Sequence, residues 1–450
     1  MPTVTVLGAN SQVVSLSYGA GDMAAAAQAL ASTIASDLQS GQLTAVKYTG
    51  SAPPAQVNGA LFVDSVPHGT ALRQPAGYNV LVDTAPGQIA VFGAPGSVQR
   101  VLAGDGGLFY YFGAVSGGSV LAGNGNNYVT SADPATGSIP ASGGVYAVTL
   151  GNGNNVVALE SGQSTISTGT GMNVVALGTS SSQVYAAGGQ TTIVGDTAPG
   201  ALPGSGNDTI TAGGGFVSVY GGYSDFTFVG GTGTVTVQGA GGSDTVFANQ
   251  ATGLFVAGTA GNSVIVGGDT GAGVVSTFTD ASGFHVTSGQ VLVGFANGDR
   301  LTAGQSGAEY LQAGSGNETL DGSQSLGDDT YFAGNNLQFS SGTFYAVTQI
   351  NTGAGSSTVF GGNGFSTVTA GSGNTTLAFV QGIAAGGTMV ISSFDPAREQ
   401  VRLYGYGDGA AQAAIAGAQV GAGGTVVTLS DNTRIVFQGY AGGFGPSSLG

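Results

Sequence analysis

The amino-acid sequence predicts an all-β fold: a parallel β-solenoid or β-roll built from nonapeptide repeats, with a small α+β region before it and a β-rich cap after it. Two observations support this prediction. An apolar residue recurs every nine residues along much of the chain, and glycine gathers between these apolar positions. Such a short period suits a coiled solenoid, because each short strand sends one row of side chains inward and then turns.

The nine-residue period is clearest over residues 203–265, which divide into seven units whose eighth residue is always apolar. The same period gives five units over residues 150–194 and three over residues 352–378. Only 41% of the chain is apolar, so apolar residues at every eighth place indicate a buried row. The predicted inward residues are Val157, Ile166, Val175, Val184, Ile193, Ile210, Val219, Phe228, Val237, Val246, Phe255, Val264, Val359, Val368 and Leu377.

Glycine falls mainly in the first four places of a unit, as in Gly221-Gly222 and in residues 230–233. Tight turns need backbone angles that glycine reaches at low cost, so these glycines are predicted to form the turns. Disordered chains are poor in apolar residues and rich in charge, whereas this chain is 41% apolar and only 7% charged. The composition therefore favours a folded chain with a long core.

Residues 1–94 do not follow the period and are predicted to form an α+β cap or a separate interaction region. The Ala-rich segment from Asp22 to about Gln39 favours a helix, and Gly41 lies just beyond its end. Strands are expected at residues 3–7, 13–18, 43–48, 60–63, 78–82 and 89–92.

The solenoid is predicted to cover residues 95–382, with a loose period at first that places Leu102, Tyr111, Val120 and Val129 inward. Irregular insertions interrupt the period near residues 195–202, 266–303 and 334–347. Insertions in solenoids often project from one face and bind partners, so these segments are the predicted lateral binding surface. Residues 383–450 are predicted to form a C-terminal cap, because an open solenoid end exposes apolar surface and strand edges.

Charge and composition exclude several classes of function. The chain has 7 Lys and Arg against 23 Asp and Glu, a net charge of −16, and Lys47 is its single lysine. Nucleic acid and anionic membranes are therefore poor partners. The absence of cysteine excludes disulfides and thiolate metal sites. We find neither an apolar run long enough to span a membrane nor an N-terminal signal, so export is expected to use a route that reads no N-terminal signal.

Three segments come close to the calcium-binding pattern G-G-x-G-x-D-x-U-x, in which U is apolar. Residues 203–211 read Pro-Gly-Ser-Gly-Asn-Asp-Thr-Ile-Thr, and residues 239–246 and 327–331 are further matches. In this pattern the Asp carboxylate and the turn carbonyl groups supply the hard oxygen ligands that calcium prefers. Over about residues 95–380, the chain resembles the RTX family of hemolysin-type calcium-binding repeat proteins.

The resemblance implies a parallel β-roll with Ca²⁺ held between turns, and secretion by a type I machinery that reads a C-terminal signal. Residues 394–396 and 428–437 look like the ends of such exported proteins, so residues 383–450 are also the predicted secretion-signal region. The expected location is extracellular, at the cell surface. The absence of an N-terminal signal agrees with this route.

The repeats depart from the family pattern at the sixth place, where only Asp208 and Asp244 of the fifteen residues are aspartates. With two units per coil, Phe226 would separate these two residues and Asn262 would follow them. Asn, Ser and Thr elsewhere in the row can hydrogen-bond along the stack. We therefore expect a mostly hydrogen-bonded solenoid with a few calcium ions, rather than a dense calcium array. The calcium candidates are Asp208, Asp244, Glu309, Glu318, Asp321, Asp328 and Asp329, and the alternative for each is a solvated loop carboxylate.

No catalytic residue is predicted. The sequence contains no G-x-S-x-G elbow, P-loop or H-E-x-x-H motif. His285 is near Asp280 and Asp299-Arg300, the one segment that combines a histidine, carboxylates and an arginine, and an ordinary polar turn is the favoured interpretation of it.

The predicted function is therefore structural: a secreted scaffold, surface-layer-like, fibre or biofilm component of a bacterial surface or extracellular matrix. Its expected partners are further copies of itself, with help from calcium, and cell-surface polysaccharide. The alternative is a carbohydrate-active or carbohydrate-binding β-helix protein, similar to a lyase or epimerase, that uses the irregular insertions as its binding surface.

Overall fold

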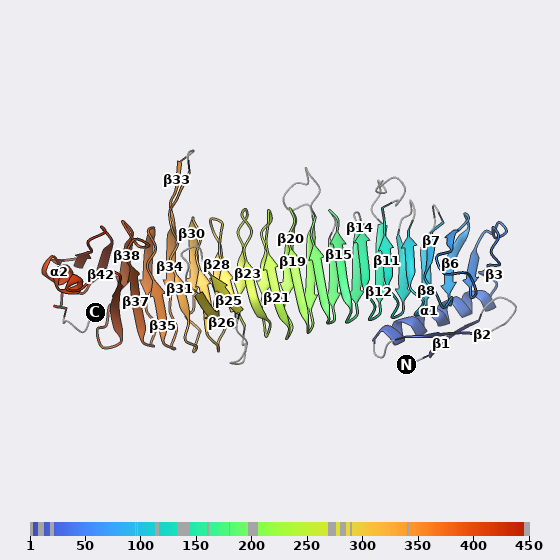
Figure 1. Ribbon diagram of the computed structural model, residues 1–450, viewed down its shortest axis with the longest axis horizontal. Coiled ribbons are helices and arrows are strands. Elements are labelled where there is room, and N and C mark those ends of the chain that lie inside the picture. Colours follow the sequence, from blue (N-terminus) through green and yellow to red (C-terminus); the bar gives the residue numbers. More distant parts are fainter. Residues whose placement is uncertain are drawn as a thin grey trace. The chain divides into compact units, whose positions relative to one another are not determined.

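The computed structural model describes residues 3–7, 13–18, 22–94, 96, 98–112, 117–132, 144–159, 162–179, 181–196, 206–268, 276–279, 285–288, 290–339 and 342–444. The chain forms two compact units, Met1–Phe226 and Thr227–Gly450. Each unit is a coil of short parallel strands that alternate between two sheets (Figure 1). The predicted parallel β-solenoid is confirmed.

Unit 1 contains two parallel sheets, here called the β12 sheet and the β11 sheet. The β12 sheet consists, in order, of β3 (Thr44–Lys47), β4 (Gly59–Val63), β6 (Tyr78–Asp83), β8 (Gln99–Ala103), β10 (Gly117–Ala122), β12 (Gly144–Leu150), β14 (Gly162–Thr168), β16 (Ser182–Ala186) and β18 (Asn207–Ala212). The β11 sheet consists of β5 (Ala71–Arg73), β7 (Ile89–Phe92), β9 (Leu108–Tyr111), β11 (Asn127–Thr130), β13 (Asn155–Leu159), β15 (Met172–Leu177), β17 (Gln190–Val194) and β19 (Phe216–Tyr220).

Unit 2 repeats this arrangement with the β28 sheet and the β23 sheet. The β28 sheet consists of the parallel strands β20 (Asp225–Val229), β22 (Thr245–Phe247), β24 (Val264–Val266), β28 (Arg300–Thr302), β30 (Asn317–Asp321), β34 (Val347–Asn351), β36 (Phe365–Thr369), β38 (Thr388–Ser392) and β42 (Arg434–Gln438), closed by the antiparallel β41 (Gly424–Thr428) and β40 (Gln419–Gly421). The β23 sheet consists of β21 (Thr234–Gln238), β23 (Thr252–Val256), β27 (Gln290–Val293), β29 (Glu309–Gln312), β31 (Thr330–Phe332), β35 (Ser357–Phe360), β37 (Thr375–Val380) and β39 (Glu399–Tyr404). Helix α2 (Ala410–Ala416) lies near β41.

The inward rows of both units follow the nine-residue period with one exception. Fourteen of the fifteen predicted inward residues are buried, but Val264 is 37% exposed and the buried residue is Ile265. Val246 pairs with Ile265, so the strand has moved by one residue. The turn before β24 is one residue longer than the period allows, and Gly261, with φ of 82°, takes part in it.

Two residues at the start of the solenoid also differ from the prediction. Val120 pairs with Val101 rather than Leu102, and Val129 pairs with Tyr110 rather than Tyr111. Leu102 is still fully buried, because it points to the outer face of the β12 sheet and is covered there. Its burial on the wrong face explains why the apolar pattern alone gave the wrong register.

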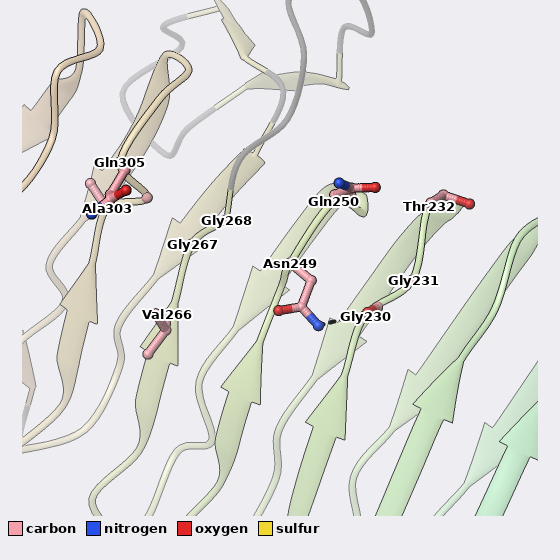
Figure 2. Close-up of a pocket in the computed structure, with 11 residues that line it drawn as sticks. Gly230, Gly231, Thr232, Asn249, Gln250, Val266, Gly267, Gly268, Ala303 and Gln305 are labelled. Atoms are coloured by element: carbon pink, nitrogen blue, oxygen red, sulfur yellow. Dashed lines mark hydrogen bonds between the residues drawn. The ribbon is translucent and has the colours of Figure 1, made fainter.

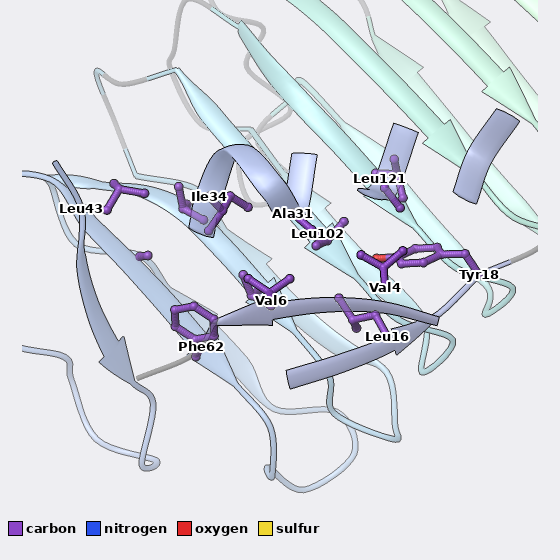
Figure 3. Close-up of a cluster of buried hydrophobic side chains, with 14 residues drawn as sticks. Val4, Val6, Leu16, Tyr18, Ala31, Ile34, Leu43, Phe62, Leu102 and Leu121 are labelled. Atoms are coloured by element: carbon purple, nitrogen blue, oxygen red, sulfur yellow. The ribbon is translucent and has the colours of Figure 1, made fainter. Parts of the chain in front are cut away.

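The outer face of the first coils is covered by β1 (Thr3–Leu7), β2 (Val13–Ser17) and α1 (Asp22–Gln39), as Figures 1 and 3 show. Helix α1 buries one face through Ala27, Ala31 and Ile34, whose spacing of four and three residues places them on the same side. These residues pack in one cluster with outward residues of the sheet, among them Phe62 and Leu102. The predicted helix over residues 22–39 is confirmed.

The parallel ladder begins at β3. It therefore starts earlier in the chain than the nonapeptide period, which begins at about residue 95. Strand β5 was not expected from the sequence, since it is only three residues long. An ion pair of 2.7 Å between Arg100 and Asp37 joins β8 to α1, so helix and ladder form one packed body within unit 1.

Two of the predicted irregular insertions contain antiparallel hairpins. Strands β25 (Ser276–Thr279) and β26 (His285–Ser288) form the first, which contacts β23, β27 and β29. Beneath it the outward residues Val291 and Tyr310 are buried in a second apolar cluster. Strands β32 (Leu337–Phe339) and β33 (Gly342–Phe344) form the other hairpin. Residues 197–202, Asp280 and the side chain of His285 lie outside the described part of the chain.

Three of the strands at the ends of the parallel ladders carry a lysine or an arginine. In unit 1, Lys47 lies on β3 and Arg73 on β5; among the described strands, β3 pairs with β4 alone and β5 with β7 alone. In unit 2, Arg402 lies on β39, whose described partner is β37 alone. Three of the chain's seven cations are thus on strands with an open edge, where charge opposes pairing with another chain.

Candidate calcium sites

Each repeat places its sixth residue at the end of a turn, two residues before the inward apolar side chain. In the β11 sheet this row contains Asn127, Asn155, Asn173 and Thr191, which are aligned from strand to strand and buried. Each strand begins just after a glycine-rich turn, so the side chain folds back over its own turn. It therefore faces the turn carbonyl groups and the side chain of the next coil.

The asparagines of this row form a continuous hydrogen-bonded ladder. The Asn155 Nδ2 atom donates to the carbonyl oxygens of Gly151 at 2.9 Å and Gly153 at 2.8 Å, and to the Asn173 Oδ1 atom at 2.9 Å. Asn127 does the same with its own turn and with Asn155 Oδ1, at 2.9 Å. Each amide nitrogen thus lies among three oxygens, two from the backbone and one from the neighbouring coil. The expectation of hydrogen bonds along the stack is confirmed here.

A second pair of rows ties the exposed parts of the same turns together. The backbone N–H of Asn152 donates to Asn124 Oδ1 at 3.1 Å, and that of Thr170 donates to Asn152 Oδ1 at 3.0 Å. The backbone N–H of Met172 likewise donates to Asn154 Oδ1 at 3.1 Å. These bonds occupy turn amides that a strand ladder cannot reach, so the coil needs no metal ion in this segment to satisfy them.

Five of the seven predicted calcium candidates occupy this same sixth place, and all five are buried: Asp208, Asp244, Glu318, Glu309 and Asp329. The Asp208 Oδ1 atom accepts the Ser182 N–H at 2.8 Å, and both Glu318 oxygens accept the Gly314 N–H, at 3.0 and 2.9 Å. These carboxylates therefore face backbone turns, as the asparagines do, but have no hydrogen to donate when ionised.

Burial strongly disfavours the ionised form of two of these carboxylates. It raises the pKa of Asp208 to about 7 and that of Glu318 to about 8, and the nearby Asp299 carboxylate adds to the shift of Glu318. A divalent cation beside the carboxylate would remove this penalty. A bound cation would therefore shift both carboxylates toward the ionised form.

Glycine leaves room for close approach of the backbone to these carboxylates. A Cβ atom on Gly239 would lie 2.3 Å from Asp244 Oδ2, and one on Gly294 would meet Glu318 Oε2. Carboxylate oxygens beside carbonyl-rich turns are the donor set that calcium prefers, so these residues fit the ion. Among the described residues, no three His, Asp or Glu side chains converge on one point. Calcium at these turns would therefore draw part of its coordination from backbone oxygens.

The structure brings some candidates together and separates others. Glu309 and Asp329 lie on adjacent coils of the β23 sheet, and the Glu309 N–H donates to Asp329 Oδ1 at 3.2 Å. Asp328 is exposed and accepts the Ser356 N–H at 2.9 Å. Asp321 points outward and forms an ion pair with Arg300. Despite partial burial, hydrogen bonds from Ser323 and then the charge of Arg300 lower the pKa of Asp321.

The coil that follows Asp244 differs from the prediction. Its sixth-place residue is the buried Ser263, whose Oγ atom accepts the Asp244 N–H at 3.3 Å, whereas Asn262 is exposed. The one-residue shift at β24 moves Asn262 out of the row.

Sequence reasoning missed two buried carboxylates of the same kind, Asp299 and Glu399. Asp299 accepts the N–H groups of Ser263, Phe295 and Ala296, each at 2.8 Å, and burial raises its pKa. Burial also raises the pKa of Glu399, to about 7. Each lies two residues before an inward residue, Leu301 or Val401. This spacing would have found both if the period had not been broken before them.

A pocket of about 620 Å³ lies at the opposite turns of unit 2, after β20, β22, β24 and β28 (Figure 2). Its lining is rich in glycine, contains Asn249, Gln250 and Gln305, and includes none of the candidate carboxylates. The Asn249 Nδ2 atom donates to the Gly230 carbonyl at 2.9 Å. This pocket has no charged lining residue, so its chemistry is not that of a calcium site.

Asp83 is a buried carboxylate that is not a calcium candidate, so it tests how burial alone affects the pH dependence of stability. Burial raises its pKa to about 7, whereas an unfolded chain gives about 3.9. The folded chain thus keeps a proton that the unfolded chain releases. The contribution of Asp83 to stability is therefore fully present below about pH 4 and falls as the pH rises toward 7, by about 4 kcal/mol for a shift of this size.

We expect Asp83→Asn to remove this fall, because an amide keeps the acceptor for the Ala85 N–H, 3.0 Å from Asp83 Oδ1, and does not ionise. The measurement is urea unfolding from pH 4 to 8 with a chelator present. The exposed Asp408→Asn is the control, and should leave the pH profile unchanged. Equal pH dependence in Asp83→Asn and wild type would contradict the assignment.

Comparison with protein families agrees with the site geometry. The RTX calcium-binding nonapeptide repeat matches the chain four times, at residues 203–225, 227–251, 303–336 and 350–377. These segments include all seven calcium candidates, whereas the asparagine ladder from Asn127 to Thr191 lies before the first of them. No curated protein matches the chain, and no solved structure does.

Proposed function

We propose, on the premise that this chain is an RTX calcium-binding repeat protein, that it serves as a secreted structural component of a bacterial surface or extracellular matrix. In this role, copies of the chain associate with one another when calcium is bound. The repeats are calcium-binding, and proteins that carry them are typically secreted by the type I route. The scaffold role, the self-association and the cell-surface location go beyond that premise.

The observation that supports the proposal most is how the buried polar groups are used. The asparagine ladder and the sixth-place carboxylates face their own turns, so their chemistry stabilises stacking rather than an open cleft. The pocket of Figure 2 has no acid, base or cation in its lining. A lyase or epimerase needs such groups facing its substrate. A rigid coil with satisfied turns suits a load-bearing or lattice-forming role.

The remaining properties agree with life outside the cell. The chain carries a net charge of −16 and no cysteine, so neither disulfides nor a reducing compartment affects its folding. Among the described residues, no helix has both the length and the apolar character required to cross a membrane. Millimolar extracellular calcium would keep low-affinity repeat sites filled, as in other extracellular calcium modules.

Light scattering after size exclusion, combined with circular dichroism, tests the proposal. With calcium at a few millimolar we expect species much larger than one chain of 43.5 kDa, and with a chelator we expect their dissociation. The double variant Glu309→Gln/Asp329→Asn should need more calcium for assembly, while the exposed Asp408→Asn should match the wild type. A folded monomer at every calcium and protein concentration would refute the scaffold role.

A further inference from the structure

We propose that unit 2 carries a binding groove for a neutral saccharide on the turns that lead into β24, β28, β30 and β34. The groove has a volume of about 590 Å³, within the usual range for small-molecule sites. Residues 259–262, 295–297 and 315–316 line it together with Tyr345. This inference names a ligand class, and it does not depend on self-association.

Two exposed aromatic side chains provide the apolar part of the groove. Tyr345 is 71% exposed and Phe295 is 49% exposed, and they lie on turns of different coils. An exposed aromatic ring can pack against the flat C–H face of a sugar ring. Two rings on separate coils can contact successive sugars of one chain.

Amide and hydroxyl groups supply the polar part. Thr259, Asn262, Asn297 and Ser315 also line the groove. Such groups donate and accept hydrogen bonds, as sugar hydroxyl groups require. The pocket of Figure 2 has amides but no aromatic residue in its lining, so it lacks the apolar half of this recognition.

The turns that present these groups are fixed from below. The N–H groups of Phe295 and Ala296 both donate to the buried Asp299 carboxylate at 2.8 Å. The N–H of Ala346, next to Tyr345, donates to Asn336 Oδ1 at 2.8 Å. The N–H of Asn262 donates to Ser243 Oγ at 3.1 Å. The groove is therefore held in place before a ligand arrives, which lowers the entropic cost of binding.

Charge decides between neutral and acidic saccharides. None of the lining residues is charged, so no cation is present to pair with a uronate carboxylate. The Asp299 and Glu318 carboxylates lie beneath the same turns, and the chain as a whole carries a charge of −16. The negative charge of the chain as a whole repels an acidic polysaccharide, so the groove favours neutral sugars.

Binding is tested with the full chain in calcium buffer by titration calorimetry. The probes are hexasaccharides of glucose, mannose, galactose and N-acetylglucosamine, with hexagalacturonate as the acidic probe. We expect at least one neutral hexasaccharide to bind with a Kd between about 0.1 and 1 mM. Phe295→Ala and Tyr345→Ala should each weaken that binding at least about tenfold, equivalent to about 1.4 kcal/mol.

The matched control is Phe365→Ala, which removes an aromatic side chain of similar exposure, 44%, from β36 of the same sheet, outside the groove. Its affinity should equal that of the wild type, and circular dichroism should show the same fold for all variants. The proposal is overturned if no neutral hexasaccharide binds, if only hexagalacturonate binds, or if Phe365→Ala weakens binding as much as the groove variants. A monomeric protein that binds a neutral sugar would refute the scaffold role and leave the groove intact.

Discussion

Changing Asn155 to aspartate is expected to destabilise unit 1 by about 3–5 kcal/mol without calcium, and calcium should restore much of that loss. The Asn155 amide nitrogen lies within 2.9 Å of three oxygens. A carboxylate at this place would bring negative charge against all three and leave two turn carbonyls without a donor. The same three oxygens and the new carboxylate would form part of a calcium coordination shell.

The measurement is urea unfolding followed by circular dichroism, at 0 and 10 mM calcium. Asn154→Asp is the matched control: it adds the same charge one residue earlier, on an exposed side chain whose oxygen accepts the Met172 N–H and can continue to do so. Its stability should change by less than about 0.5 kcal/mol. If calcium does not change the unfolding of Asn155→Asp, the amide nitrogen of Asn155 does not occupy a place where a calcium ion could bind.

Removal of calcium is expected to loosen the repeats at residues 303–336 while the asparagine ladder keeps its protection from hydrogen exchange. The first segment contains the buried Glu309, Glu318 and Asp329, which cannot donate hydrogen bonds when ionised. The ladder satisfies its turns with amides, so calcium contributes nothing to it. A site saturated at a hundred times its Kd contributes about 2.7 kcal/mol, and its loss should speed exchange about a hundredfold.

Hydrogen exchange read by mass spectrometry, with calcium, with chelator and with magnesium, resolves the two segments. Magnesium should not replace calcium, because it demands a small octahedral shell that flexible turn carbonyls match poorly. Equal loss of protection over residues 144–195 and 303–336 would contradict the division of roles. Unchanged exchange throughout would remove the seven candidates as calcium ligands.

The coiled fold could be predicted because burial imposes a strict period on the inward row. The inward residue was predicted wrongly in two situations. Either another element buried an outward residue, or a turn was longer than the period allows. Val264 and Ile265 are both apolar, so the sequence hides the longer turn that selects Ile265. Leu102 is buried by α1 on the outer face, and its apolar character therefore indicated the wrong register.

The candidate sites were predictable for a related reason. The spacing of an acid and an inward apolar residue places the carboxylate over its turn wherever the period is intact, as at Asp208 and Asp244. Asp299 was missed because the β25–β26 hairpin interrupts the period shortly before it. The groove at Phe295 and Tyr345 depends on turns from separate coils, and the stacking that brings them together is not visible in a single unit of nine residues.

Charged side chains on three end strands affect how copies of the chain could pair with one another. Lys47 and Arg73 lie on the first strands of unit 1, and Arg402 lies on the last strand of the β23 sheet. Pairing of a further copy with these three strands would bring it against these charges, which opposes pairing there, whereas the edge strand β40 carries no charge. Contacts through turns and outer faces carry no such penalty. If copies associate, side-by-side contacts are therefore favoured over strand pairing at β3, β5 and β39.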